Sequence, residues 1–166
     1  SVLERLFDLP AAERTHGAAA ALVQPQWDQL LIDDPEVGAL FPSAPGAAPG
    51  GPELEAWLES SRGLLENYFA LEDPTRIEPA AREQHVEVVL DGLTLRGYID
   101  RIDIAPSGDV RIVDYKTGAS PREAFEGKAL FQMKFYALVL WRIRGVVPRQ
   151  LRLMYLADRD TLTSSP

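Results

Sequence analysis

The spacing of apolar and polar residues changes once along the chain, near residue 80. Before that point apolar side chains recur at helical intervals, and the clearest amphipathic helix covers residues 53–74. Its apolar positions are Leu54, Trp57, Leu58, Leu64, Leu65, Tyr68 and Phe69. Residues 11–32 predict further helix. Pro25 either interrupts this helix or lies in the first turn of a new helical segment. Residues 42–52 are rich in Pro, Gly and Ala and predict a loop.

After residue 80 apolar and polar residues alternate, as they do in strands. Three strands are predicted at residues 82–90, 94–104 and 109–118, with turns at 91–92 and 106–108. A long helix follows at 122–145, then a strand at 150–157, and the tail from Asp158 gives no clear signal. A helix between two strands permits a parallel crossover, so the pattern predicts an α/β (α+β) fold with a small mixed sheet flanked by helices. We expect one structural domain overall, with a helical N-terminal part at 1–80 and a core at 81–166.

Composition places the chain among globular proteins and excludes several kinds of site. Its 166 residues are 46% hydrophobic and 25% charged. No apolar run reaches the roughly 18 residues of a membrane span, and no signal peptide opens the sequence. Cysteine is absent, which excludes disulfides, thiolate zinc sites and an iron–sulfur cluster within these residues. We therefore expect a cytoplasmic protein without a membrane partner.

The net charge of −8 is unevenly distributed. Residues 1–80 hold 4 Lys and Arg against 14 Asp and Glu, whereas residues 81–166 hold 13 against 11. A polyanionic partner would therefore meet the second half. Arg142, Arg144, Arg149 and Arg152 form a basic cluster there, which either contacts a phosphate backbone or is ordinary solvated charge.

In one predicted strand, the face that begins with apolar residues ends with two charged residues. Val110, Ile112, Asp114 and Lys116 are two apart and so share a face. If residues 105–109 form the hairpin loop, Ile104 faces Val110 and Asp100 lies opposite Asp114. Two facing carboxylates repel each other by about 1 kcal/mol in water and by more in a lower dielectric.

A divalent cation would turn this repulsion into attraction, since carboxylate oxygens suit magnesium or manganese. Lys116, one pleat further, could orient a metal-bound water or stabilise charge developing on a phosphorus atom. These residues thus predict a phosphodiester-hydrolysing centre. The alternative is an exposed strand end with a weak surface ion pair between Asp114 and Lys116.

Two segments carry a family resemblance. RGYIDRIDIAPSGDVRIVDYKTG at 96–118, followed by ALFQMKFYALVLW at 129–141, closely resembles the RecB-family exonucleases of the PD-(D/E)XK nuclease superfamily. The matching features are the G-x-I-D-R-I-D strand, the D-Y-K-T-G strand end and Q-x-x-x-Y on the following helix. The resemblance implies a restriction-endonuclease-like α-β-β-β-α-β core.

The resemblance also implies roles for single residues. Asp100 and Asp114 would bind the metal together with the backbone carbonyl of Tyr115, and Lys116 would be the catalytic lysine. Gln132 and Tyr136, four apart on one helix face, would lie beside the active site and contact DNA. The alternative is that Tyr136 belongs to the core and Gln132 is its solvated edge.

The chain departs from the family at two points. Relatives carry a metal-binding His in a G-x-x-x-H context before an LERLF-like stretch, and this chain begins inside that stretch. His16 and His85 lack that context and are weak metal candidates. The four cysteines with which many relatives hold an iron–sulfur cluster are also absent. Both gaps fit a nuclease-core fragment.

These observations predict a metal-dependent DNA exonuclease of the RecB type, acting in DNA repair or recombination. Its cofactor would be Mg²⁺ or Mn²⁺, and its partners would be DNA and a helicase or other repair subunit. The alternative is a catalytically incomplete DNA-binding or scaffolding module that retains the nuclease fold.

Overall fold

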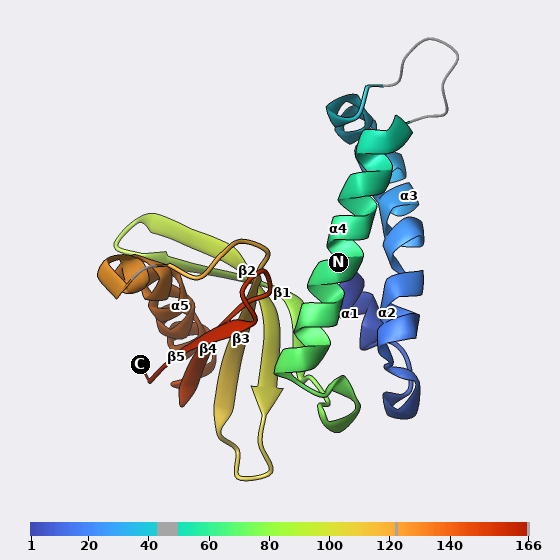
Figure 1. Cartoon of the computed structure of the whole chain (residues 1–166). Helices are drawn as coiled ribbons and strands as arrows, with labels where there is room; N and C mark the ends of the chain where they lie inside the picture. Colours follow the sequence, from blue (N-terminus) through green and yellow to red (C-terminus); the bar gives the residue numbers. More distant parts are fainter. Residues whose placement is uncertain (43–49, 122, 166) are drawn as a thin grey trace. The chain divides into compact units, whose positions relative to one another are not determined.

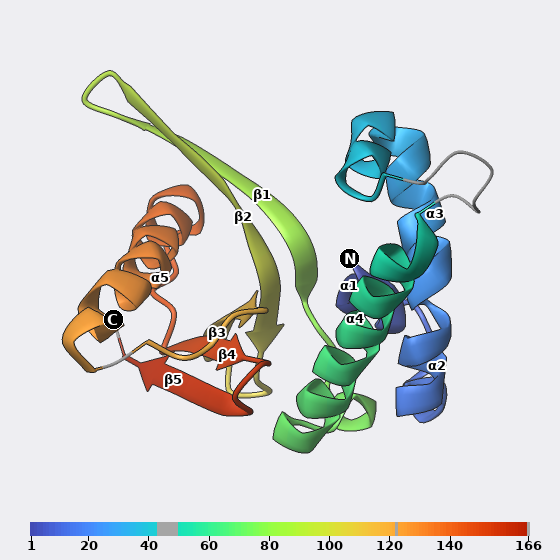
Figure 2. The same ribbon diagram turned by 45° about the horizontal axis from the view of Figure 1, so that its top comes forward.

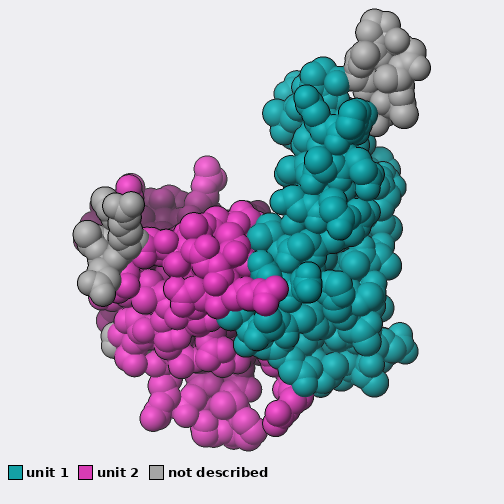
Figure 3. All heavy atoms as spheres, viewed as in Figure 1, with its two compact units in different colours: residues 1–75 teal, residues 76–166 magenta. Residues whose placement is uncertain are grey.

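The computed structural model describes residues 1–42, 50–121 and 123–165. Most of the loop predicted at 42–52 therefore lies outside the described residues. The chain divides into two compact units, residues 1–75 and residues 76–166 (Figures 1 and 3). That these units form one structural domain stays a prediction. None of the helices in the described part is long and apolar enough to cross a membrane.

The first unit is helical. It contains α1 (Val2–Leu6), α2 (His16–Ala21), α3 (Val23–Asp33) and α4 (Gly51–Leu71), with short 3₁₀ helices at Ala11–Glu13 and Pro35–Leu40. Pro25 lies in the first turn of α3, where a missing N–H leaves no hydrogen bond unmade. Helix α4 buries Leu58, Leu65 and Tyr68, which confirms the amphipathic pattern predicted for residues 53–74.

The second unit is a five-stranded mixed sheet with one long helix. After a 3₁₀ turn at Pro74–Arg76 come β1 (Ala81–Leu90), β2 (Leu93–Ile104), β3 (Val110–Lys116), α5 (Glu123–Arg144), β4 (Gln150–Tyr155) and β5 (Asp160–Ser164). The strands lie in sequence order, with β3 and β4 parallel and the other neighbours antiparallel. This α+β arrangement confirms the predicted fold class and the parallel crossover.

Strand β5 is the one element of the sheet that the sequence pattern did not predict. It pairs antiparallel with β4 at the edge of the sheet. Its residues are only partly buried, and Leu162 is its only strongly apolar side chain. A short edge strand without clear alternation gives little signal.

The hairpin between β2 and β3 has the predicted register. Ile104 pairs with Val110 and Ile102 with Ile112. The loop closes through hydrogen bonds from the Gly108 amide to the Ala105 carbonyl and from the Ala105 amide to the Asp109 carbonyl, at 2.8 and 2.9 Å. Gly108 has φ +88°, a conformation that glycine adopts without strain.

The main core of this unit lies between α5 and the sheet. The β1–β2 hairpin curves over the side of the sheet that α5 covers (Figure 2). Helix α5 contributes Met133, Tyr136, Ala137, Val139 and Leu140, and the strands contribute Val86, Ile99, Ile102, Val110, Ile112, Leu151, Leu153 and Tyr155. Val110 and Ile112 are thus buried on the face that ends in Asp114 and Lys116.

Candidate active site at the carboxyl end of β3

The parallel strands β3 and β4 place the charged end of the β3 face against apolar residues. Asp114 is paired with Leu153 and is only 5% exposed, and Lys116 is paired with Tyr155. In open sheets with parallel strands, ligand sites form beyond the carboxyl ends of those strands. Asp114 and Lys116 therefore lie where such a site is expected.

Asp100 reaches the same place from β2. Its Oδ2 accepts a hydrogen bond of 2.8 Å from the backbone N–H of Tyr115, the residue between Asp114 and Lys116. One further step of the β2–β3 register would set Asp100 across from Asp114, as the sequence predicted. The structure thus brings Asp100, Asp114, Tyr115 and Lys116 together.

Burial disfavours the charged form of both carboxyl groups. Burial raises the pKa of Asp100 from its ordinary value of 3.8 to about 6, the Tyr115 N–H opposes this rise, and the charge of Asp114 adds to it. Burial also raises the pKa of Asp114, against the opposing effect of Lys116. Both shifts mean that ionising the pair is unfavourable without a further positive charge.

Lys116 is held by two contacts. Its Nζ lies 2.6 Å from Asp114 Oδ2 and donates a hydrogen bond of 2.9 Å to Gln132 Oε1. The Gln132 amide in turn donates from Nε2 to the Tyr136 hydroxyl at 3.1 Å. A chain of contacts therefore runs from the α5 core to the ammonium group, and it fixes which way the Gln132 amide points.

Gln132 and Tyr136 thus have a visible role next to the lysine. Tyr136 is buried in the core, as the simpler interpretation of the sequence expected, while Gln132 is exposed. Both side chains orient Lys116 through the contacts above. Their contact with DNA stays a prediction.

Gly97 explains part of the G-x-I-D-R-I-D strand. A Cβ atom at this position would lie 2.7 Å from Cε1 of the Tyr136 ring, closer than real Cβ contacts allow. The glycine therefore leaves room on β2 for the Tyr136 ring, whose hydroxyl accepts the hydrogen bond from Gln132.

Glu83 is an acidic neighbour that the sequence analysis did not single out. It has φ +43°, an unusual value for a residue with a side chain. It lies between the Arg82–Arg101 and Gln84–Ile99 pairs of the β1–β2 ladder, at the step that faces Asp100. Its charge further raises the pKa of Asp100. The sequence held one signal for this position. The segment AREQ at 81–84 is mostly polar, where a strand with alternating apolar residues was expected.

The second acid of the same strand has a different role. Asp103 Oδ1 lies 3.0 Å from Nε of Arg101, which is 1% exposed, and Asp103 Oδ2 lies 2.7 Å from Nη2 of Arg111. Arg101 also donates a hydrogen bond of 2.5 Å to the Tyr115 hydroxyl. Asp103 therefore forms ion pairs with two arginines, and it lies on the opposite face of β2 from Asp100.

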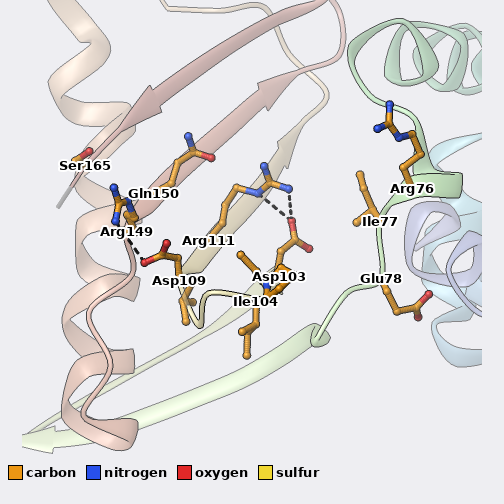
Figure 4. Close-up of a pocket in the computed structure, with 13 residues that line it drawn as sticks. Arg76, Ile77, Glu78, Asp103, Ile104, Asp109, Arg111, Arg149, Gln150 and Ser165 are labelled. Atoms are coloured by element: carbon orange, nitrogen blue, oxygen red, sulfur yellow. Dashed lines mark hydrogen bonds and ion pairs between the residues drawn. The ribbon is translucent and has the colours of Figure 1, made fainter.

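A hollow of about 520 Å³ lies at the opposite end of β3 (Figure 4). Three cations and three acids line it: Arg76, Arg111 and Arg149, and Glu78, Asp103 and Asp109. Arg111 and Arg149 point toward Asp103 and Asp109, with which they form ion pairs. Because its charges cancel, this hollow lacks the excess positive charge that would hold a phosphate.

The two histidines pack against aromatic rings. His85 lies 5.0 Å from Tyr98 between ring centroids, and His16 lies 5.8 Å from Phe69. In the part of the chain that the structure describes, no group of three or more His, Cys, Asp or Glu side chains could hold a metal by itself. A cation at this site would therefore rely on two carboxylates.

The donor set fits a hard divalent cation. Mg²⁺ is commonly bound through one or two carboxylates, with waters and substrate phosphate oxygens completing its shell. Asp100 and Asp114 supply two such carboxylates. Burial raises the pKa of both, so a positive charge beside them would favour their ionised forms. Tyr115 directly follows Asp114 in β3, and the role of its backbone carbonyl as a further metal ligand stays a prediction.

The fold and the site together define a restriction-endonuclease-like protein: a helix, three antiparallel strands, a crossover helix and a parallel strand, with two acids and a lysine at the carboxyl end of the third strand. A family model described as PD-(D/E)XK nuclease superfamily matches residues 1–166. The chain belongs to that superfamily, whose members are generally divalent-metal-dependent nucleases.

Two curated relatives come from mycobacterial viruses. The chain is 39% identical over 66 residues to the Gene 69 protein of Mycobacterium phage D29. These aligned residues make up 40% of this chain and 22% of that protein. It is 30% identical over 86 residues to the Gene 69 protein of Mycobacterium phage L5. Here the aligned residues make up 52% of this chain and 27% of that protein. The matched part thus spans about a quarter of each relative.

Proposed function

We propose that this chain is the nuclease core of a metal-dependent DNA exonuclease of the RecB type, acting in DNA repair or recombination. The observation that carries the proposal is the close arrangement of Asp100, Asp114 and Lys116, with Gln132 bonded to the lysine. DNA would be the substrate, and a helicase or other repair subunit the protein partner.

Asp100 and Asp114 would hold a magnesium or manganese ion, with the Tyr115 carbonyl as a further ligand. Such an ion, when bound, supplies positive charge for a phosphoryl oxygen and lowers the pKa of a bound water. The burial of Asp114 keeps competing solvent away from that carboxylate.

Lys116 would act on the reacting groups directly. Its ammonium, one third exposed, can donate hydrogen bonds to the attacking water and offset the charge that develops on the phosphorus oxygens. Gln132 and Tyr136 keep the flexible lysine chain in place, so that less ordering is needed when substrate arrives.

The test is cleavage of end-labelled single- and double-stranded DNA in the presence of Mn²⁺, comparing the unmodified chain with Lys116→Ala. The proposal predicts shortening from an end by the unmodified chain and a loss of at least about a hundredfold in the variant. Arg96→Ala, which removes an exposed cation from β2, is the matched control and should cut normally.

Two outcomes would contradict the proposal. Equal cutting by the Lys116→Ala variant would show that the activity arises elsewhere. Binding of DNA without any cutting, with Mn²⁺ present, would favour the non-cutting module instead.

A further inference from the structure

A long stretch of this acidic protein contains no acid at all. Residues 127–157 include six Lys and Arg and no Asp or Glu, although the whole chain has a net charge of −8. The stretch covers most of α5 and all of β4. Its cations are Lys128, Lys134, Arg142, Arg144, Arg149 and Arg152.

Three of these cations share the outer face of α5 with apolar side chains. Phe131, Lys134, Leu138, Trp141 and Arg142 follow one another at helical spacing, and Lys128 precedes them by one turn. Phe131 is 70% exposed, Trp141 44% and Leu138 39%, so this face does not pack on the sheet. We refer to these six residues as the α5 surface.

The cations of the α5 surface are available for a ligand. Neither Lys128, Lys134 nor Arg142 forms an ion pair with another described residue. By contrast, Arg62, Arg101 and Arg111 are each paired with acids. The guanidinium of Arg142 instead lies 4.8 Å from the centre of the Trp141 ring.

We propose that the α5 surface binds a single strand of nucleic acid, with phosphates at the three cations and bases stacked on Phe131 and Trp141. This rests on the proposed function and adds to it the strandedness of the substrate. Exposed aromatics between cations are the common design of single-strand sites, because unpaired bases offer their faces for stacking. A duplex keeps its bases stacked on one another and would gain only the phosphate contacts.

The position and length of the surface suit this role. Gln132, which bonds to Lys116, directly follows Phe131, so the α5 surface lies on the same helix that contacts the candidate active site. From Phe131 to Trp141 the helix rises about 15 Å. That distance matches about four stacked nucleotides.

A protein partner fits the surface less well. Lysine is depleted in protein–protein interfaces, and two of the three cations here are lysines. A second copy of the chain, docked through its acidic residues, is the competing occupant that the experiment must separate.

The experiment is fluorescence anisotropy with a labelled oligothymidylate of about 20 nucleotides and a duplex of equal length. Every protein carries Lys116→Ala, and EDTA is present, so that no strand is cut. The double substitution Phe131→Ala and Trp141→Ala should weaken single-strand binding by about tenfold or more and leave duplex binding unchanged. Tyr98→Ala, which removes a 60% exposed aromatic from β2, is the control and should change neither.

The cations have their own readout. Replacing Lys128, Lys134 and Arg142 by Ala should lower the slope of log affinity against log salt by about two, since each phosphate contact on a single strand contributes about 0.7. Arg96→Ala should leave the slope unchanged.

The result that overturns the proposal is single-strand binding that is unchanged in the aromatic variant, or equal losses for strand and duplex. Sedimentation of the same proteins supplies the second criterion. If the substitutions abolish a dimer and not strand binding, the surface joins copies of the chain and the proposal is wrong.

Hydrolysis of bis(p-nitrophenyl) phosphate with Mn²⁺ separates this proposal from the proposed function. The small ester needs the Asp100, Asp114 and Lys116 site but no long strand. Failure of this hydrolysis in the unmodified chain, with strand binding still dependent on Phe131 and Trp141, would refute the nuclease function alone. Intact hydrolysis with unaltered strand binding in the aromatic variant would refute the α5 surface alone.

Discussion

Asp100 and Asp103 lie three residues apart in one strand and have different surroundings. Asp100 is largely buried and lies near another carboxylate, so its charge is unfavourable although it accepts a hydrogen bond from a backbone N–H. Asp103 lies between two arginine side chains, so its charge is balanced. The first arrangement suits a site that awaits a cation, and the second suits a structural ion pair.

Asp103→Asn should therefore destabilise the protein. Removing the acid breaks the ion pair that the buried Arg101 forms with Asp103, and breaking a buried pair costs about 3 kcal/mol or more. Asp109→Asn, which removes an exposed partner of Arg149, should cost less than about 1 kcal/mol. Urea unfolding of both variants checks this, and similar losses would show that Asp103 has no special structural role.

Asp114→Asn should abolish cleavage while the metal-free protein stays equally or more stable. The substitution removes a buried charge whose ionised form is unfavourable, and it removes repulsion from Asp100. Thermal unfolding in EDTA measures the stability. A large loss would instead identify Asp114 as a residue needed for folding through its ion pair with Lys116.

Stability without metal should fall as the pH rises through the titration of Asp100. The folded group has a pKa of about 6 against 3.8 for the ordinary side chain, so between these values the folded state binds more protons. The contribution is therefore unfavourable above about pH 6 and absent below about pH 4.

The measurement is the free energy of unfolding in EDTA at about pH 4 and about pH 8, compared with Asp100→Asn. The variant should gain stability relative to the unmodified protein as the pH increases. A pH-independent difference between the two proteins would contradict the account.

At the scale of elements, helix α5 connects the hydrophobic core to Lys116 of the candidate active site. Its inner face buries Met133 and Leu140, while one turn of its side carries the contact from Tyr136 through Gln132 to Lys116. The orientation of the lysine therefore depends on its contact with Gln132. Gly97 leaves room on β2 for the Tyr136 ring, to which Gln132 is hydrogen-bonded.

Gly97→Ala should disturb this contact. The added Cβ would push on the buried Tyr136 ring, and overpacking of this kind typically costs about 1–3 kcal/mol. We expect a lower kcat with little change in KM, because Lys116 loses its orientation while the substrate contacts remain. Gly63→Ala in α4, where nothing lies within 4 Å of the new Cβ, should instead stabilise the protein by up to about 1 kcal/mol.

Tyr136→Phe separates packing from hydrogen bonding, since it keeps the ring and removes the hydroxyl. It should lower kcat with a smaller loss of stability than Gly97→Ala causes. Unchanged kcat in both variants would mean that the chain of contacts to Lys116 does not matter for catalysis.

The sequence predicted most of the sheet because the signals there are local. Alternation over 109–118 and a five-residue loop were enough to set the β2–β3 register, which brings Asp100 toward Asp114. The unusual backbone of Glu83 could not be predicted in this way, since it depends on the twist and pairing of two long strands. The different roles of Asp100 and Asp103 also depend on neighbours far along the chain, such as Arg111 and Tyr115.

At the scale of the whole molecule, charge is divided between the two units. The basic residues concentrate in the second half, with 13 of the 17 Lys and Arg in residues 81–166, and the acid-free stretch of the second unit covers most of α5 and all of β4. This division directs a polyanion toward the unit that holds the candidate active site.

The most direct test of the account is the effect of Mn²⁺ on the melting temperature of the unmodified protein and of Asp114→Asn. A ligand that binds only the folded state must stabilise it, so millimolar Mn²⁺ should raise the melting temperature of the unmodified protein. The rise should be lost in Asp114→Asn and kept in Asp109→Asn. An equal rise in all three proteins, or none in the unmodified protein, would contradict a metal site at Asp100 and Asp114.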